Sequence, residues 1–437
     1  MLNILTNRTY RHLFLAQVIA LVGTGLATIA LGLLAYDLAG AEAGAVLGTA
    51  LAIKMTAYIG VAPVAAAFAD RWPRRTMLVS LDLVRAFVAL ALPFVTEVWQ
   101  VYVLIFVLQS ASAAFTPTFQ ATIPDILPDE GDYTKALSLS RLAYDLESVA
   151  SPMLAAALLT VISFHSLFAG TVVGFLASAA LVCTVVLPTA KPGPRRSIYE
   201  RTTRGMRIFL ATPRLRGLLA LNLAVAAASA MVIVNTVVLV QSTFQLPQSS
   251  TALALAAFGG GSMLAALVLP RLPKDVSDHT AMLAGGGMLV LGLALGIPLG
   301  SYQWLLPLWL FLGIGYSLSQ TPSGRLLRRS AHAEDRPALF AAQFALSHAC
   351  GLITYPLAGW MGAKVGLTAS FVALTLVAAA ALALSLLIWR PEHEREIVEH
   401  THERNGDVHG KDPATEAHEH PYIIDDEHPR WPKGPGR

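Results

Sequence analysis

Charged residues lie near the middle of two long apolar stretches of the chain, where a charge is costly unless it is paired or hydrated. Lys54 falls in the stretch 44–67, and Arg141, Asp145 and Glu147 fall in 137–161. Arg141 lies one helical turn before Asp145, so the two can pair. A carboxylate beside a lysine in apolar surroundings can bind or release a proton when its access to water changes. We therefore predict proton coupling at these four residues, with a static ion pair as the alternative.

Six further polar side chains interrupt the apolar stretches and could hydrogen-bond a small molecule. They are Gln17, Gln109, Asn222, Asn235, Gln343 and His348. We predict that they line a substrate path, although a lone amide in an apolar helix also commonly bridges two helices. His348 could additionally titrate near neutral pH or bind a metal ion.

The composition indicates that these residues are positioned by membrane-spanning helices. Apolar residues make up 55% of the 437 positions and charged residues 14%, which is too apolar for one or two soluble cores. Stretches of about 20 residues, the length that crosses a bilayer as a helix, recur along the chain. The expected spans number twelve: 13–36, 44–67, 76–95, 99–122, 137–161, 166–187, 217–240, 251–270, 280–299, 303–321, 338–361 and 366–389.

Basic residues predict the orientation of these spans. The loops on the side of the N-terminus carry many basic residues, whereas the opposite loops contain only Lys364. By the positive-inside rule both termini are cytoplasmic, in a bacterial inner (plasma) membrane. A Pro-rich and basic connection divides the spans into two sets of six. The expected organisation is an N-terminal bundle over 1–190, a cytoplasmic linker over 191–212, a C-terminal bundle over 213–390 and a disordered His-rich tail over 391–437.

A repeated proline pattern indicates that the two halves are duplicates. Thr116-Pro117 recurs as Thr321-Pro322, and Ser151-Pro152 recurs as Tyr355-Pro356, at offsets of 205 and 204 residues. Pseudo-symmetric halves of this kind are typical of secondary transporters, which rock around a site near mid-membrane. The predicted fold class is thus an all-α membrane protein with two pseudo-symmetric six-helix bundles.

The loop between the second and third spans carries the most specific motif. Ala66-Ala67-Phe68-Ala69-Asp70-Arg71-Trp72-Pro73-Arg74-Arg75 resembles the Gly-x-Leu-Ala-Asp-Arg-x-Gly-Arg-Arg/Lys loop of the major facilitator superfamily, with Ala66 and Pro73 where that family usually has glycine. The resemblance covers residues 8–390 and implies the major facilitator fold. An acid followed by arginines can form an ion-pair latch that is made in one state and broken in another. We predict a gating loop of Asp70, Arg71, Arg74 and Arg75, while the arginines could equally serve only to fix topology.

The first half also resembles one exporter branch of that superfamily. Asp82-Leu83-Val84-Arg85-Ala86, Gln120-Ala121-Thr122-Ile123-Pro124-Asp125 and Ser151-Pro152 are similar to segments of macrolide and enterobactin efflux proteins. The resemblance implies efflux, and proton antiport is the coupling that it suggests. Glu147 and Ser151 stand where antiporters of the superfamily usually have glycine.

The tail contains seven histidines among many acids, including two His-x-His pairs. His400, His402, His418 and His420 are chemically able to bind nickel, zinc or copper ions. The tail is similar to the His-rich cytoplasmic tails of nickel-resistance exporters, whereas a merely solvated tail is the alternative.

Several function classes are disfavoured. The chain has no Gly-x-x-x-x-Gly-Lys-Ser/Thr loop for ATP and no Ser/His/Asp arrangement at a membrane surface, so we expect neither an enzyme nor a cofactor. The expected activity is proton-coupled efflux of a small toxic or amphipathic organic solute, with divalent metal efflux (nickel or cobalt) as the alternative and uptake as a third option. The expected partners are this substrate, protons and membrane lipid, without nucleic acid, and we expect a monomer.

Overall fold

The computed structural model describes most of the chain. The described residues are 2–68, 73–129, 157–187, 198–269, 277–332, 335–394, 397–400 and 418–424, with His428 and Trp431. Within 130–156 it describes Asp132, Tyr133, Lys135, Ala136, Leu139, Ser140, Ala143, Glu147, Ser151, Leu154 and Ala155, which are all helical.

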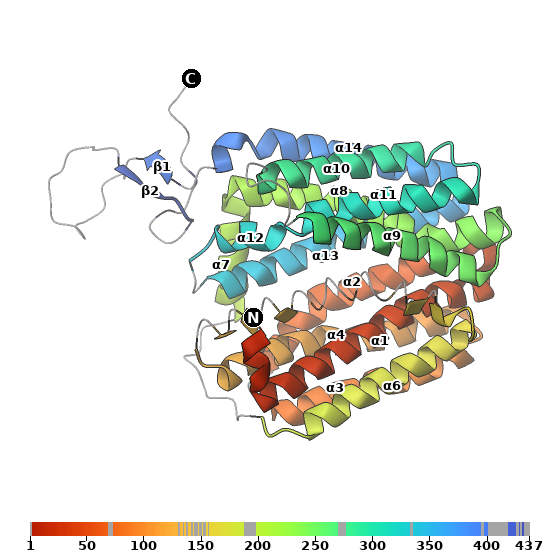
Figure 1. Cartoon of the computed structure of the whole chain (residues 1–437), viewed down its shortest axis with the longest axis horizontal. Coiled ribbons are helices and arrows are strands. Elements are labelled where there is room, and N and C mark those ends of the chain that lie inside the picture. Colours follow the sequence, from red (N-terminus) through yellow and green to blue (C-terminus); the bar gives the residue numbers. More distant parts are fainter. Residues whose placement is uncertain are drawn as a thin grey trace.

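Long helices form the N-terminal half, shown in red to yellow in Figure 1. They are α1 (Arg8–Ala39), α2 (Ala43–Phe68), α3 (Arg74–Ala91), α4 (Val98–Ile126) and α6 (Phe164–Cys183), and the short turns beside them are η1 (Leu2–Thr6), η2 (Gly40–Glu42) and η3 (Leu92–Phe94). The fifth span predicted at 137–161 falls on the partly described stretch. Asn7 caps α1 by accepting a hydrogen bond from the Tyr10 amide at 3.1 Å.

The C-terminal half, in green to blue, repeats this order (Figure 1). Its helices are α8 (Pro213–Val237), α9 (Gln248–Val268), α10 (Asp278–Leu295), α11 (Tyr302–Gln320), α13 (Arg336–Lys364) and α14 (Leu367–Ile388). A π-helical turn, η4 (Val238–Thr243), extends α8, and the short α12 (Ser323–Arg328) follows α11. The helix α7 (Ile198–Ala211) precedes α8 and packs against α13.

The two halves are duplicates in both sequence position and packing. The helices α1 and α8 begin at Arg8 and Pro213, 205 residues apart, and α4 and α11 begin at Val98 and Tyr302, 204 residues apart. In the first half α1 packs against α6 and α2 against α4; in the second half α8 packs against α14 and α9 against α11. The predicted pseudo-symmetry is confirmed. One difference is that α4 continues through Pro117, whereas Pro322 separates α11 from α12.

The surface of the bundle is apolar, as membrane solvent requires. Nine stretches of the described chain are long and apolar enough to cross a membrane, and the first, Arg8–Val61, contains α1 and most of α2. Large side chains such as Phe87, Val173 and Leu376 are exposed on the bundle. Trp99 and Trp304 are exposed at the starts of α4 and α11, where amphipathic rings typically meet the interface. The predicted all-α membrane class is thus confirmed.

The tail departs from the predicted disorder at several described positions. A short turn, η6 (Pro391–Glu394), precedes the strand β1 (Ile397–His400), which pairs antiparallel with β2 (His418–Pro421). Tyr422 and Ile424 are buried in an apolar cluster with residues of α7, α8, α12 and α13. The average polarity of the tail conceals these few apolar residues, which find an apolar surface only in the folded bundle.

Candidate functional site

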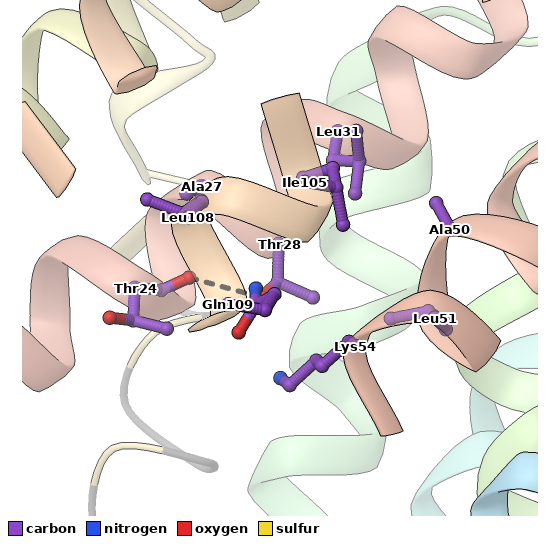
Figure 2. A pocket seen from close by; sticks show the side chains of 10 residues that line it. All are labelled: Thr24, Ala27, Thr28, Leu31, Ala50, Leu51, Lys54, Ile105, Leu108 and Gln109. Atoms are coloured by element: carbon purple, nitrogen blue, oxygen red, sulfur yellow. Dashed lines mark hydrogen bonds between the residues drawn. The ribbon is translucent and has the colours of Figure 1, made fainter. Parts of the chain in front are cut away.

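A small cavity lies inside the N-terminal half between α1, α2 and α4. It is lined by Thr24, Ala27, Thr28, Leu31, Ala50, Leu51, Lys54, Ile105, Leu108 and Gln109. Figure 2 shows Lys54 of α2 and Gln109 of α4 extending into the same space beside Thr28, whose hydroxyl donates to the Thr24 carbonyl at 3.0 Å. The cavity volume is about 10 Å³. That is room for about one water molecule, so an organic solute does not fit in this state.

Glu147 is a described acid that interacts with Lys54, the lysine that lines this cavity. It interacts electrostatically with Lys54, and Ser151 lies beside its carboxylate. A Cβ placed on Gly25 of α1 would overlap Ser151 and the Glu147 Oε1 atom, so the missing side chain of Gly25 makes room for the acid. The structure therefore brings Lys54 and Glu147 within electrostatic range of each other. Arg141 and Asp145 lie outside the described residues.

Five of the six polar residues predicted for the substrate path fall into two groups, and His348 is described with Tyr58 below. Gln17 accepts a hydrogen bond from Ser140 at 3.1 Å, and Asn235 donates to the Ala358 carbonyl at 3.0 Å and to Ser370 at 3.2 Å. These two residues bridge helices, which is the alternative considered for a lone amide.

The other group has buried polar atoms without a hydrogen-bond partner among the described residues, as the Asn235 Oδ1 atom also has. The Oε1 atoms of Gln109 and Gln343 and the Nδ2 atom of Asn222 are buried without a hydrogen-bond partner among the described residues. The Oδ1 atom of Asn222 accepts a hydrogen bond from Gln320 at 3.4 Å. An unmatched buried polar atom costs stability, and it often marks a position that a ligand or water satisfies. Of these residues, Gln109 lines the cavity.

The predicted gating loop is partly described. Asp70 and Arg71 lie outside the described residues. Arg74 forms an ion pair with Asp125 at the end of α4, and Arg75 donates to the Cys183 carbonyl at the end of α6 at 2.5 Å. Both arginines therefore tie helices of the same half together.

The C-terminal half contains a charge-reversed counterpart that the sequence analysis missed. Asp278 begins α10, 204 residues after Arg74, and it forms an ion pair with Arg325 of α12 at 2.5 Å. Hydrogen bonding to Asp278 raises the pKa of Arg325 above its usual value. Applying the repeat offset to Arg74 would have identified Asp278. Each half thus has one ion pair at the start of its third helix.

The two halves meet mainly along α2 and α13, which lie side by side in the middle of the molecule (Figure 1). Small residues allow the close approach, since a Cβ on Gly48 would overlap the Tyr355 carbonyl and a Cβ on Gly359 would overlap the Gly44 carbonyl. Glu42 pairs with Lys364 at 3.2 Å, and Trp360 donates to Thr49 at 3.1 Å. We call this end of the molecule, which carries η2 and η4, the η2 end.

We expect Gly48→Ala to weaken the closed contact at the η2 end. A methyl group that overlaps the Tyr355 carbonyl must push α13 away, and overpacking of this kind costs about 1–3 kcal/mol. Gly60→Ala is the matched control, because it lies on the same helix and a Cβ there meets nothing within 4 Å. Disulfide cross-linking between cysteines at Glu42 and Lys364 measures the contact. Equal cross-linking yields in the two variants would contradict the prediction.

The predicted metal ligands lie in the tail. The register of β1 and β2 places His400 opposite His418, and His420 opposite Val398. His402 lies outside the described residues. Among the side chains that the structure describes, no group of three or more His, Cys, Asp or Glu could hold a metal ion.

Comparisons with known proteins cover the bundle to different extents. A family model described as Major Facilitator Superfamily matches residues 13–294 and 218–418. The chain is 26% identical over 251 residues to the uncharacterized MFS-type transporter YfiS of Bacillus subtilis, covering 54% of this chain and 57% of the relative. It is 28% identical over 189 residues to macrolide efflux protein A of Streptococcus pyogenes, covering 40% of this chain and 46% of the relative. The match therefore spans about half the length of these relatives.

Solved structures of low sequence identity share the fold. The nucleoside transporter NupG superposes with a TM-score of 0.70 at 12% identity, covering 87% of this chain and 100% of that one. A bacterial homolog of the human lysosomal transporter Spinster, in an inward-facing and unoccupied conformation, superposes with a TM-score of 0.65 at 13% identity, covering 88% and 98%.

Proposed function

This chain belongs to the Major Facilitator Superfamily of membrane transporters, and from that membership we propose that it exports a small organic solute by proton-coupled alternating access. The observation that carries this proposal is the placement of Glu147 against Lys54 inside the N-terminal half, beside the main contact with the other half. A proton-binding acid next to a movable interface is the arrangement that coupling requires.

In the proposed mechanism the two halves move relative to each other as units. Residues 1–190 and 213–390 are the proposed bodies, joined by a linker at 191–212. Their described contacts concentrate along α2 and α13 and at the η2 end, where η2 also meets η4. Separation of these contacts would open the η2 end, and Arg74–Asp125 and Asp278–Arg325 would keep each half intact during the motion.

Proton exchange would proceed through the Lys54 and Glu147 pair. When Glu147 is ionised, its charge is compensated by Lys54, and when it binds a proton, Lys54 is left as an uncompensated cation in a cavity with room for about one water molecule. That imbalance favours a state in which the cavity gains water. Asp145 and Arg141 are proposed to assist on the same helix.

The proposed direction of transport and the proposed substrate class are supported by similarity to relatives. Macrolide efflux protein A is an exporter by its name, and its similarity to this chain supports export of an amphipathic organic compound. The cavity of the described state is lined mostly by apolar side chains, with one lysine, one amide and two threonines, which suits a solute of this kind in a more open state. Inner-membrane placement and cytoplasmic termini are part of the proposal.

Transport into inverted vesicles tests this proposal. We expect vesicles that contain the full chain to accumulate radiolabelled erythromycin when acidified inside, and to lose that accumulation when both the pH gradient and the membrane potential are collapsed. A panel with ethidium and Ni²⁺ tests the substrate class. Accumulation that survives the collapse of both gradients, without another ion to drive it, would exclude proton coupling.

A second candidate function is divalent metal export assisted by the tail. The specific observation in its favour is the antiparallel register that places His400 opposite His418. Directly opposed residues in an antiparallel pair have Cβ atoms about 5 Å apart. The strand pair is also tethered before β1, because Glu394 pairs with Arg329 and accepts a hydrogen bond from Trp389 at 2.7 Å.

We expect the double variant His400→Ala/His418→Ala to bind Ni²⁺ at least about tenfold more weakly than the unaltered protein, as loss of supporting ligands usually does. Isothermal titration of the purified full chain measures the affinity, and His165→Ala on α6 is the control. Unchanged affinity in the double variant, or no Ni²⁺ binding by the unaltered chain, would reject the metal candidate while leaving organic export untouched.

A further inference from the structure

Three aromatic side chains connect the two halves near the middle of the α2 and α13 contact. The rings of Tyr58 on α2 and His348 on α13 stack with centroids 5.0 Å apart and an interplanar angle of 6°. The ring centroid of Phe344 lies 5.5 Å from that of Tyr58 and 4.0 Å from that of His348. Because α2 and α13 belong to different halves, this cluster is broken whenever the halves separate at this level.

The Tyr58 ring also contacts the proposed proton site. The Lys54 Nζ atom lies 5.9 Å from the centroid of the Tyr58 ring, which is within cation–π range. Lys54 in turn interacts with Glu147. A continuous series of interactions therefore runs from Glu147 through Lys54 and Tyr58 to His348, and it crosses from one half to the other.

The orientation of the His348 ring is fixed by its own helix. Its Nδ1 atom lies 2.7 Å from the Phe344 carbonyl, and a carbonyl only accepts, so Nδ1 carries a proton in both charge states. The second proton is gained at Nε2. Imidazole is the side chain whose ordinary titration falls between pH 5 and 8. Gaining that proton would put a second positive charge on the Tyr58 ring, close to Lys54, and like charges repel strongly where water is scarce.

We propose that His348 is a second proton-binding coupling residue and that Tyr58 transmits its charge to the Lys54 and Glu147 pair. A proton on Glu147 leaves Lys54 uncompensated, so a further proton on His348 is tolerated only when α2 and α13 move apart. Protonation of both sites therefore opens the η2 end, and the end closes again, with the proton kept on Glu147 for release on the other side, once His348 has lost its own proton. This inference rests on the proposed function, because it extends proton coupling from the first half to the second.

Other ionisable groups around α13 are few at this level. The helix α14 has none, and those of α8 are confined to Arg214 and Arg216 at its start. The described arginines of α7 include Arg204, which pairs with Asp335 before the first turn of α13 at 2.5 Å. On α13 itself the nearest are Cys350 and Tyr355, and Glu42 of η2 meets Lys364 at the far end of the helix. Among the described residues, Tyr58 is therefore the titratable group of the other half that contacts His348, and Lys54 and Glu147 follow behind it.

Distance measurements between spin labels test the inference without any substrate. Cysteines replace Thr96, in the loop before α4, and Gln303, at the start of α11, in a full chain whose Cys183 and Cys350 are replaced by serine. The protein is held in phosphatidylethanolamine and phosphatidylglycerol nanodiscs at several values between about pH 5 and pH 8. We expect acidification to raise the ratio of long to short distances at the η2 end about tenfold.

His348→Phe keeps an aromatic ring but cannot titrate, and we expect it to lose that pH response, as should His348→Gln. His165→Phe is the matched control, since the His165 ring also lies against a phenylalanine ring, with centroids 4.0 Å apart, but is exposed at the start of α6. Tyr58→Phe should retain the response and Tyr58→Leu should lose it.

A wild-type response in His348→Phe, or in Tyr58→Leu, would overturn the inference. Erythromycin accumulation in vesicles is measured on the same proteins. If the unaltered chain changes distance with pH in a His348-dependent way but moves no substrate, the proposed function fails and the inference stands. If it transports with coupling but His348→Phe behaves as the unaltered chain in both assays, only the inference fails.

Discussion

Glu147→Gln is expected to abolish proton-driven accumulation while leaving the bundle folded. Glutamine has nearly the size and hydrogen-bonding capacity of a protonated glutamate, so it still fits the space opposite Gly25, but it cannot exchange a proton. For one-to-one exchange, each unit of pH gradient supports a roughly tenfold solute gradient, and the variant should lose all of it. Radiolabelled erythromycin accumulation in inverted vesicles, with the pH gradient varied, measures the loss.

The variant should still allow passive exchange of solute across the membrane, because alternating access itself requires no proton once the charge is removed. Asp37→Asn is the matched control, since Asp37 is an exposed acid near the end of α1 and should keep full accumulation. Accumulation by Glu147→Gln equal to that of the unaltered chain would remove Glu147 from the coupling mechanism. Asp145 would then be the remaining acid of the predicted set.

The largest loss of stability is expected for Asp82→Ala on α3. Asp82 is fully buried and pairs with Arg85, which is 4% exposed, and it accepts a hydrogen bond from Ser178 of α6 at 2.7 Å. The Arg85 guanidinium also lies over the rings of Phe115 and Phe175. Removing the acid leaves a buried cation without its partner, which costs about 3–5 kcal/mol. Thermal denaturation followed by size-exclusion chromatography in detergent measures the loss.

Asp132→Ala is the control for this prediction, because Asp132 and Lys135 form a pair of the same spacing in which both side chains are exposed. An exposed pair contributes about 0–1 kcal/mol, so this variant should differ little from the unaltered chain. Asp82→Leu combined with Arg85→Leu should recover much of the stability, since apolar replacement of a whole buried pair is often tolerated. Similar losses of stability in Asp82→Ala and Asp132→Ala would show that burial does not determine how much these ion pairs contribute to stability.

Helix positions were predictable from the sequence to within a few residues. The span predicted at 280–299 is α10, Asp278–Leu295, and the span at 366–389 is α14, Leu367–Ile388. Lipid offers no hydrogen bonds to the backbone, so each spanning segment must form its own, and its bounds follow from local hydropathy alone. The repeat could also be recognised from the sequence, because proline positions can be compared directly between the two halves.

The roles of polar residues were less predictable. Gln17 and Gln109 both interrupt apolar helices, yet Gln17 bonds to Ser140 and Gln109 lines the cavity with an unmatched oxygen. The two glutamines differ in the neighbouring helix that faces them. The sequence pattern within one segment does not indicate which helix that is. The Arg74 partner Asp125 lies 51 residues away and was not foreseen.

By itself the sequence determined the membrane class, the duplication of the bundle and the segments that carry Lys54 and Glu147, because hydropathy and backbone hydrogen bonding act within one segment. Only the tertiary structure decided that Gly25 leaves room for Glu147 and that Tyr58 meets His348 across the halves. Helices in lipid associate through close packing of small residues, and that depends on the shapes of two distant faces at once. The contacts that would couple a proton to motion are of this second kind.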